Sequence, residues 1–406
     1  MAASRLRISF VCSHFPHPEV DHAGGIGFFN YIKSLNERHE VSLISFIQPF
    51  EEKHISQMRE LCADVEVVCD PRPVLYKAIR HPLRRVVYPK RCCYSYSPRY
   101  REKLKALLDR REFDIVHIQG PWMAQYMDLI KGPKVVLDEV DVHSLVAYRQ
   151  YQNAKHFGEK AYNLFEWAKC QSFELEACQR ADLVLTRSEK DRRFIQSYLP
   201  GQNVEILPPW FEGLEQFAHI SEKPTQEKSL LFLGMMGRIR NAEAALYFYE
   251  EIFPLIKEKI PQTKFYIVGS SPGEKIRQLA RDKDVIVTGY VEDIGYYYEK
   301  CAVFVAPILV GGGIIVKILN AMAAGRPVVT TPFGNEGIEA IPEREIRIAN
   351  SPAEFARKTI ELLTNDSLRY MIAKNGQDFV QRQYNWEDVM QGLERAYRSL
   401  MEKSTI

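Results

Sequence analysis

Short apolar runs alternate with amphipathic segments of helical length along most of the chain. The runs are nearly continuous in Val, Ile and Leu, which is typical of parallel strands buried on both faces of a sheet. In the first half we expect strands at 7–11, 39–44, 65–68, 114–118, 134–137, 182–186 and 204–207. In the second half we expect them at 229–233, 264–268, 285–288, 303–307 and 327–330. Each series predicts a doubly wound α/β domain.

The boundary between the two series falls at a stiff, extended stretch, Pro208-Pro209-Trp210, which suits a linker. A chain of 406 residues also exceeds one ordinary hydrophobic core. Near the end, apolar residues recur at helical spacing along one side, at Trp386, Val389, Leu393, Tyr397 and Leu400. We therefore expect domains at 1–207 and 208–383 and a final helix within 384–406.

Residues 303–330 carry the most specific local pattern. An apolar strand runs into three glycines at 311–313, and a helix follows that stops at Gly325. One face of this helix is predicted to carry Ile315, Ile318, Leu319 and Met322. A glycine loop entering a helix presents free N–H groups and the positive end of the helix dipole to a phosphate. Glycines also close ordinary strand-to-helix turns, so the residues alone leave both interpretations open.

The sequence from residue 317 to 337 reads KILNAMAAGRPVVTTPFGNEG. It resembles the donor-binding segment of the family 4, or "group 1", retaining glycosyltransferases, and the resemblance extends over most of 225–390. It implies the α/β fold called GT-B, in which two doubly wound Rossmann-like domains face each other across a cleft. It also implies a last helix that crosses back to the N-terminal domain. A nucleotide diphosphate sugar would be the co-substrate, with no further cofactor and no metal.

The resemblance implies donor contacts along this segment, but the chain departs from the family pattern. Asn320 stands where the family has an acidic residue that accepts hydrogen bonds from the ribose, and an amide carries no charge. Gly312 occupies the first acidic position, as in the triple-glycine branch of the family. Ile314 and Ile315 replace the usual Thr-Arg of that branch, although their N–H groups and that of Gly313 could still bind phosphate.

Basic residues are expected to stabilise the departing diphosphate. Met235 takes the place of the family's usual Arg, so we expect Arg238 and Arg240 to supply the charge, with help from Lys317. The alternative, basic side chains that are merely solvated, stays open. The resemblance also places the nucleotide base near Gly289 and Tyr290.

In the N-terminal half, the glycine pair Gly24 and Gly25 follows the first strand, where the family brings the diphosphate and the acceptor together. A glycine-rich turn without a ligand is the competing interpretation. Asp141 follows the strand at 134–137 and corresponds to a family residue that contacts the sugar or the acceptor. We therefore count Asp141 with Arg238 and Arg240 as candidate catalytic residues.

Compartment and partners follow from coarser features. Eight cysteines without paired spacing favour free thiols in a reducing compartment. No apolar run reaches the ~18 residues of a membrane span, so we expect a cytoplasmic protein, peripheral at the inner face of the membrane. Residues 72–111 hold thirteen Lys or Arg against two acids, interleaved with tyrosines. This suits an anionic membrane with a lipid-linked acceptor. A simply solvated basic face is an equal alternative, and no nucleic-acid-binding motif accompanies it.

Together these features predict a glycosyltransferase that moves a sugar from a nucleotide diphosphate sugar to a glycan or lipid-linked glycan, with retention. The competing hypothesis is a non-catalytic GT-B module that acts as a partner or scaffold. Met235, Ile314, Ile315 and Asn320 favour that alternative, whereas the glycine loops and the two arginines argue against it.

Overall fold

The computed structural model describes residues 5–19, 23–69, 82–211, 213–217, 219–220, 227–310 and 313–402. The chain forms two compact units. Unit 1 comprises Met1–Trp210 with Trp386–Ile406, and unit 2 comprises Phe211–Asn385. Each unit contains one sheet in which every strand pairing is parallel.

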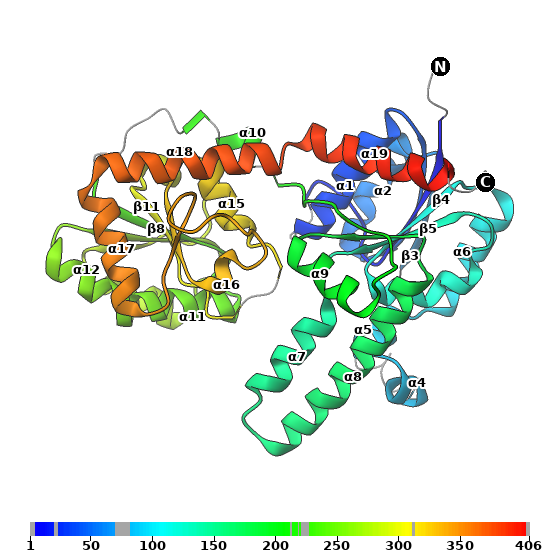
Figure 1. Ribbon diagram of the computed structural model, residues 1–406, viewed down its shortest axis with the longest axis horizontal. Helices are drawn as coiled ribbons and strands as arrows, with labels where there is room; N and C mark the ends of the chain where they lie inside the picture. Colours follow the sequence, from blue (N-terminus) through cyan, green and yellow to red (C-terminus); the bar gives the residue numbers. More distant parts are fainter. Residues whose placement is uncertain are drawn as a thin grey trace. The chain divides into compact units, whose positions relative to one another are not determined.

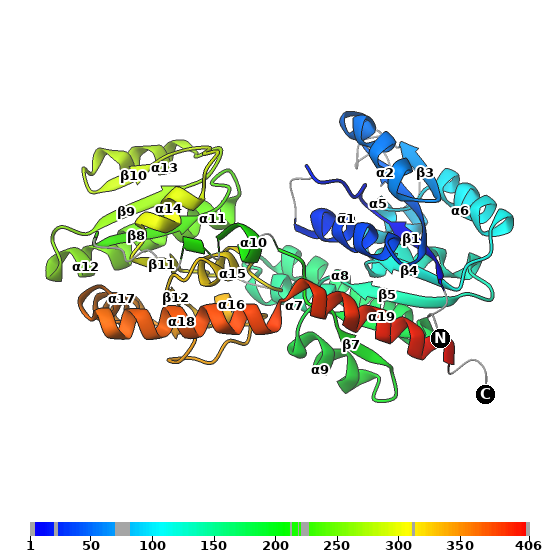
Figure 2. The same cartoon turned by 90° about the horizontal axis from the view of Figure 1, so that it is seen from above.

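The sheet of unit 1 has seven strands in the order β3-β2-β1-β4-β5-β6-β7 (Figure 1). Their bounds are β1 Arg7–Cys12, β2 Glu40–Ile47, β3 Asp64–Cys69, β4 Ile115–Gln119, β5 Lys134–Glu139, β6 Leu183–Thr186 and β7 Val204–Ile206. One face is covered by α1 (Ala23–Asn36), α2 (Ile55–Leu61) and α19 (Trp386–Glu402). The other is covered by α6 (Pro98–Arg110), η2 (Pro121–Leu129), α8 (Phe157–Arg180) and α9 (Glu189–Tyr198). Figures 1 and 2 both show α19 beside α1.

The sheet of unit 2 has six strands in the order β10-β9-β8-β11-β12-β13. Their bounds are β8 Ser229–Leu233, β9 Lys264–Val268, β10 Val285–Val287, β11 Val303–Ala306, β12 Val328–Thr330 and β13 Arg347–Ile348. Figure 1 shows α18 (Asp366–Gln383) on one side of the strands and α11 (Ile239–Tyr247) and α12 (Phe253–Lys259) on the other. α17 (Pro352–Thr364) shares the core of α11 and α12, whereas α14 (Gly295–Lys300) and α15 (Val316–Ala323) share that of α18.

Shorter elements complete the two units. In unit 1 these are η1 Pro49–His54, α4 Pro82–Val87, α5 Lys90–Tyr94 and α7 His143–Asn153. In unit 2 they are α10 Gly213–Phe217, η4 Phe248–Ile252, α13 Glu274–Gln278, η5 Leu279–Arg281 and α16 Pro332–Asn335. In the part of the chain that the structure describes, no helix is both long enough and apolar enough to cross a membrane. None of the eight cysteines, all of which lie in the described ranges, forms a disulfide bond.

Every strand expected from the apolar runs forms, because such runs can be satisfied only inside a sheet covered on both faces. The sequence analysis did not predict β13, because a strand of two residues is too short to show an apolar run or an alternating pattern. The region 242–260 does not form one regular helix, because Pro254 has no N–H group to donate to the preceding turn. The chain widens there into the π-helical turn η4 between α11 and α12.

The pair α7 and α8 was also missed by the sequence analysis. The two helices lie antiparallel and extend away from the sheet of unit 1 (Figure 1). Tyr148 and Tyr151 of α7 hold them together by packing on Trp167 of α8, with ring centroids 4.8 and 6.3 Å apart. Phe157 and Phe165 of α8 remain exposed. Apolar residues therefore lie on more than one side of this helix, and it lacks the one-sided pattern by which an amphipathic helix is recognised.

A buried polar cluster fixes α19 to the centre of the first sheet. The hydroxyl of Tyr397 donates to Nδ1 of His117 at 2.5 Å, and Nε2 of His117 donates to Asp138 at 3.3 Å. Arg187 lies 2.7 Å from the same carboxylate. Burial alone would raise the pKa of Asp138, but the charge of Arg187 and the bond from His117 lower it below its usual value. The cluster therefore holds a buried carboxylate beside a guanidinium and an imidazole.

Replacing Tyr397 with Phe should destabilise unit 1 by about 1–3 kcal/mol, because Nδ1 of His117 loses its partner in a dry site. All four tryptophans belong to this unit, so urea unfolding followed by tryptophan fluorescence reports on it selectively. The matched control is Tyr198→Phe, the same change on an exposed ring. Equal midpoints for the two variants would contradict a structural role for the Tyr397 hydroxyl.

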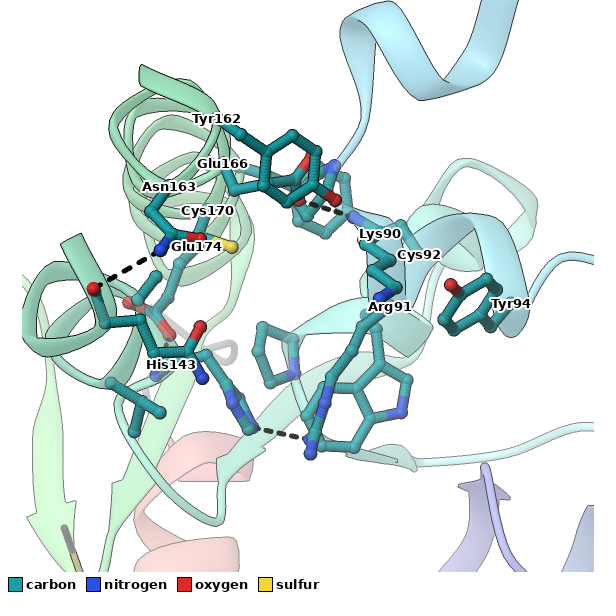
Figure 3. Close-up of a pocket in the computed structure, with 17 residues that line it drawn as sticks. Lys90, Arg91, Cys92, Tyr94, His143, Tyr162, Asn163, Glu166, Cys170 and Glu174 are labelled. Atoms are coloured by element: carbon teal, nitrogen blue, oxygen red, sulfur yellow. Dashed lines mark hydrogen bonds between the residues drawn. The ribbon is translucent and has the colours of Figure 1, made fainter. Parts of the chain in front are cut away.

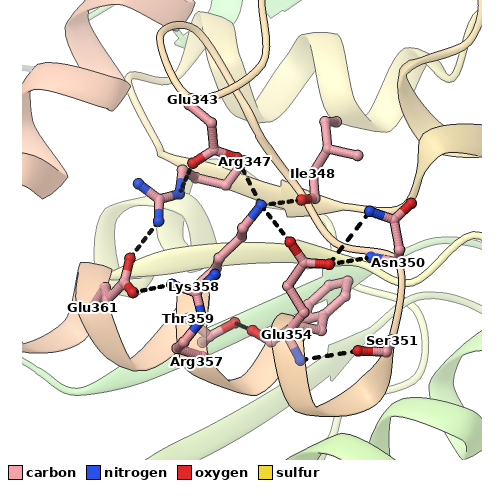
Figure 4. A network of polar contacts seen from close by, with 11 residues as sticks. Glu343, Arg347, Ile348, Asn350, Ser351, Glu354, Arg357, Lys358, Thr359 and Glu361 are labelled. Atoms are coloured by element: carbon pink, nitrogen blue, oxygen red, sulfur yellow. Dashed lines mark hydrogen bonds and ion pairs between the residues drawn. The ribbon is translucent and has the colours of Figure 1, made fainter.

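A second polar cluster joins β13 to α17 in unit 2 (Figure 4). Lys358 is buried and donates to Glu343 at 2.7 Å and to the backbone carbonyl of Ile348, and it pairs with Glu354 at 2.9 Å. Arg347 bonds Glu343 from the other side, at 3.0 Å. The last strand is only two residues long, so these bonds supply the attachment that its ladder cannot.

Lys358→Met should lower the stability of unit 2 by about 1–3 kcal/mol, because the carbonyl of Ile348 and two carboxylates lose a buried partner. Circular dichroism should detect the shift, whereas the tryptophan signal of unit 1 should not move. The matched control is Lys374→Met, which breaks an exposed ion pair with Asp378 and should change stability by less than ~0.5 kcal/mol.

Candidate functional site

The strand order of unit 2 reverses between β8 and β11. In open parallel sheets, ligands bind beside the carboxyl ends of the strands at such a reversal, because the two neighbouring loops leave in opposite directions. In this unit the two loops are the one after β8, which leads to Arg238, and the one after β11, which leads into α15. Most of the donor-side candidates from the sequence follow one of these two strands.

At the carboxyl end of this sheet, the loops after β8, β9 and β10 contact one another through the backbones of three glycines, Gly234, Gly269 and Gly289. Gly269 adopts φ +143°, and a Cβ atom there would lie 1.9 Å from the carbonyl oxygen of Gly234. Its N–H group donates to the carbonyl of Gly289 at 3.1 Å, and Gly289 itself has φ +74°. The edge is therefore held close by main-chain contacts. Tyr290, the next residue, is 76% exposed to solvent.

The loop entering α15 is partly described. Gly313 has φ +72°, and its carbonyl packs so closely on Gly337 that a Cβ there would lie 2.6 Å away. Gly312 lies outside the described residues. α15 begins at Val316, so the expected place of Ile315 within the helix is wrong, and Ile315 is its N-cap residue. An Ile side chain cannot cap the first turn. The N–H group of Ile318 donates to the carbonyl of Ile315 at 2.9 Å, which leaves the N–H groups of Val316 and Lys317 for a ligand.

Ile314 and Ile315 pack partly against the hydrophobic core of unit 2. Their side chains thus strengthen the attachment of the loop and offer no polar group. In contrast, Ile318, Leu319 and Met322 are buried as the sequence predicted. The phosphate-binding capacity of this loop rests on its backbone and on the neighbouring basic side chains.

Lys317 is the basic side chain at the centre of the site. Its ammonium donates to Oδ1 of Asn241 at 2.7 Å and lies 4.8 Å from the ring centroid of Phe232. No carboxylate lies within ion-pair distance of it among the described residues. Burial, together with the charge of Arg238, lowers the pKa of Lys317 from 10.5 to about 8. A buried cation with a lowered pKa and no acidic partner is typical of a functional site that binds an anion.

Arg238 and Arg240 are exposed on the loop after β8 and on the first turn of α11. Arg238 is close enough to depress the pKa of Lys317, which places the two positive charges at one site. Asn241, in the first turn of α11, joins this site because its amide accepts from Lys317 and donates to the carbonyl of Met235 at 2.9 Å. The sequence analysis overlooked Asn241 because nothing in its local sequence shows that it bridges Lys317 and the loop after β8.

Asn320 lies one helical turn beyond Lys317. Its Oδ1 atom is buried and accepts no hydrogen bond from any described residue. A Cβ atom on Gly213 would come within 2.4 Å of this oxygen, so only glycine fits there. An unpaired buried acceptor is unusual and suits a ligand hydroxyl as its partner. The contact of Gly213 with Asn320 could not be predicted from the sequence, because α10 lies more than a hundred residues before Asn320 in the chain.

The candidates of unit 1 form a separate group. α1 begins at Ala23, so Gly24 and Gly25 lie in its first turn, with Gly25 buried. Asp141 follows β5, and burial raises its pKa to about 6. Asp191 adds to this shift, whereas Arg187 and Arg91 oppose it. A carboxyl group with such a pKa can hold or release a proton close to neutral pH.

Two neighbouring histidines have different roles. His143, two residues past Asp141, accepts a hydrogen bond from Arg91 at 3.1 Å. Burial, reinforced by Arg91, lowers the pKa of His143 to about 3, so its ring is neutral. His117 is a core residue of the Asp138 cluster and takes no part in this group. No three His, Cys, Asp or Glu side chains of the described ranges gather as metal ligands, and the absence of a metal remains a prediction.

The geometry of unit 2 can therefore bind an anion beside two positive charges and a helix N-terminus, with a free acceptor one turn away. Comparison with known proteins agrees with this description. The sequence model of the family described as "Glycosyl transferases group 1" matches residues 227–365, and that of "Glycosyltransferase Family 4" matches residues 29–212.

Two relatives extend the comparison. An uncharacterised 44.6 kDa protein in the cps region of Klebsiella pneumoniae is 21% identical over 402 residues, covering 95% of this chain and 98% of that protein. An uncharacterised glycosyltransferase of Methanocaldococcus jannaschii is 23% identical over 249 residues, which cover 55% of this chain and 60% of that protein. In this second case the match spans less than two thirds of the relative.

Solved structures share the fold. Sucrose-phosphate synthase from Thermosynechococcus elongatus superimposes with a TM-score of 0.71 at 18% identity, covering 98% of this chain and 100% of that one. The Anabaena protein HepE in complex with UDP gives a TM-score of 0.67 at 14% identity, covering 97% and 100%. With both units matched by family models and both sheets parallel as expected, the chain belongs to the group 1 (family 4) glycosyltransferases of the GT-B fold.

Proposed function

We propose that this glycosyltransferase takes a sugar from a nucleotide diphosphate sugar and transfers it, with retention, to a glycan or lipid-linked glycan. The observation that carries the proposal is the Lys317 ammonium, which has no acidic partner and lies beside an uncapped helix N-terminus at the strand reversal. A departing diphosphate is the anion that this site fits. HepE binds UDP and UDP-glucose, which supports a nucleotide sugar as the donor.

In this proposal, unit 2 holds the donor and stabilises the charge that develops as the sugar leaves. Lys317, Arg238 and the N–H groups at the start of α15 would contact the diphosphate. Asn320 would accept a hydrogen bond from the ribose through its unpaired Oδ1. Gly289 and Tyr290 would border the base, as the family resemblance implies. The departing phosphate would take the proton of the acceptor, so no further cofactor, metal or dedicated base is required.

The acceptor belongs to unit 1 in this proposal, with Asp141 and the turn at Gly24 and Gly25 facing it. Two relatives support a glycan or lipid-linked acceptor. One is a phosphatidyl-myo-inositol mannosyltransferase of Mycobacterium leprae, and the other is a capsular polysaccharide biosynthesis glycosyltransferase of Staphylococcus aureus. The alternative of a non-catalytic module has less support, because the donor side keeps an anion site that a scaffold does not need.

An anionic membrane surface remains our proposal for the basic segment 72–111, of which 72–81 lie outside the described residues. Part of its charge is already neutralised within the protein. On α6 and just after it, Arg101 pairs with Asp128, Lys103 and Arg110 pair with Glu66, and Arg111 pairs with Glu40. Among the described basic residues, exposed Arg85, Arg99 and Lys105 remain available to lipid, and on α4 the exposed Val86 and Val87 follow Arg84 and Arg85.

The donor site is tested by the thermal unfolding and binding affinity of the protein against a panel of nucleotide diphosphates and their sugars. A ligand at a hundred times its Kd should add ~2.7 kcal/mol of stability. Lys317→Met should weaken binding of the preferred nucleotide about ten- to a hundredfold, whereas the control Lys374→Met, on an exposed face of α18, should not.

The same measurement has a pH signature. Lys317 is protonated below about pH 8 in the free protein, and only the protonated form attracts a phosphate. The terminal phosphate is already charged in this range, since its second pKa is ~6. Affinity should therefore fall as pH rises from 7 to 9 in the wild type and stay level in Lys317→Met. No stabilisation by any nucleotide, or an equal pH slope in both proteins, would contradict the site.

The role of Asn320 can be isolated by removing one ribose hydroxyl at a time. Wild type should prefer UDP to its 2′- or 3′-deoxy analogue by roughly two- to tenfold, the usual worth of one neutral hydrogen bond. Asn320→Leu should abolish that preference, and the isosteric Asn320→Asp should increase it because a carboxylate accepts more strongly. If all three proteins show the same preference, the Oδ1 atom does not contact the ribose.

A further inference from the structure

A cavity of about 480 Å³ lies within unit 1, between α5, η2 and the helices α7 and α8 (Figure 3). His143 lines one end of it, with the centroid of the Trp122 ring 4.7 Å from its own, and Tyr162 and Asn163 of α8 line the other end. Its size falls in the range of small-molecule sites, ~300–1,000 Å³. The cavity is much too large for a bare anion, and nothing in the donor site uses it.

The acidic groups of the cavity are already satisfied. Glu174 accepts hydrogen bonds from the backbone N–H of His143 at 2.6 Å and of Ser144 at 3.2 Å, and also from the Ser144 hydroxyl. Burial raises the pKa of Glu174, while the hydrogen bonds from Ser144 and His143 oppose that shift. Glu166 accepts from the ammonium of Lys169 and from the backbone N–H of Lys90 at 3.1 Å. Neither carboxylate is available to hold a cation.

The basic groups, in contrast, are not satisfied. The Arg91 guanidinium makes one hydrogen bond, to the neutral ring of His143, and lies 4.7 Å from the centroid of the Trp122 ring. A guanidinium has five N–H donors, so most of them remain unused. The Lys90 ammonium contacts only the ring of Tyr94, at 5.7 Å. Within the described ranges, no carboxylate lies at ion-pair distance from Arg91 or Lys90.

Other groups at the rim suit a polyhydroxylated ligand. The side-chain amide of Asn163 donates to the carbonyl of Gln150 at 3.3 Å, which leaves its oxygen as an acceptor. Tyr162 is 45% exposed and offers a ring face and a hydroxyl. An apolar wall with a few polar groups and a fixed charge is the usual composition of a site for a small organic ligand.

We propose that this cavity binds an anionic sugar residue, whose carboxylate or phosphate is held by Arg91 and Lys90 and whose hydroxyls meet Asn163 and Tyr162. The inference rests on the proposed function in one respect: we assign the sugar to the acceptor. His143 links the cavity to Asp141 through the turn after β5, so the site adjoins the candidate acceptor side of unit 1. The acceptor class is then an acidic or phosphorylated glycan.

The test is a titration of the intact chain with glucuronate, glucose 6-phosphate, glucose and inorganic phosphate. Ligand NMR and the fluorescence of Trp122 give readouts that need no donor and no turnover. At least one of the two anionic sugars should bind at least about tenfold more tightly than glucose and than phosphate. The stronger of the two identifies the source of the charge as a carboxylate or a phosphate.

Matched substitutions locate the site. Arg91→Gln should weaken binding of the anionic sugar about ten- to a hundredfold, and Lys90→Gln should weaken it less because an ammonium cannot make the forked contact of a guanidinium. The control is Arg99→Gln, the same change on an exposed residue of α6 in the same basic segment. Lys90→Gln also keeps the test valid if Arg91→Gln fails to fold, because it leaves the contacts to His143 and Trp122 in place.

Three outcomes would overturn the proposal. Glucose binding as tightly as the anionic sugars would remove the role of the charge, and phosphate binding as tightly as glucose 6-phosphate would remove the role of the sugar. Absence of binding by all four probes would remove the site. A parallel titration with UDP separates this result from the fate of the donor site, since UDP binding does not depend on Arg91.

Discussion

Backbone contact between the loops after β8 and β9 is the constraint on which the donor side of the protein depends. Gly234 and Gly269 touch through their main chains, and a single Cβ atom at Gly269 would be 1.9 Å from the opposing oxygen. The same closeness recurs at Gly213 against Asn320 and at Gly337 against Gly313. Because these contacts exclude side chains, they fix where the loops at the strand reversal must lie. The polar groups of α15 are positioned as a consequence.

The buried charges of the protein fall into two kinds. Asp138 pairs with Arg187, and Lys358 pairs with Glu343 and Glu354, and these ion pairs attach helices to sheets. Lys317 has no acidic partner among the described residues, and burial lowers its pKa, so its charged form is disfavoured in the folded protein. A buried cation without an acidic partner is typical of a site that binds an anion.

Unit 1 repeats this contrast at the cavity between α5 and α8. Its carboxylates are saturated by backbone and lysine donors, whereas Arg91 keeps most of its donors unused. The helices α7 and α8 form one wall, and their aromatic contacts with Trp167 give it rigidity. Both units therefore present positive charge to solvent-accessible space through residues that the fold itself does not need for ion pairing. This shared arrangement underlies our two proposals, a nucleotide sugar in unit 2 and an anionic sugar in unit 1.

The sequence by itself determined the parallel strands, their division between two domains and the last helix, because these depend on local periodicity. It also determined the stretch that carries Lys317 and Asn320, because that stretch is a contiguous motif. Tertiary structure decided which charges stay unpaired. Lys317 meets Asn241 across 76 residues, and Arg91 meets His143 across 52. Lys103 and Arg110 looked equally available until the fold paired them with Glu66. Whether a charge is neutralised depends on its neighbours in space, and a linear pattern does not contain them.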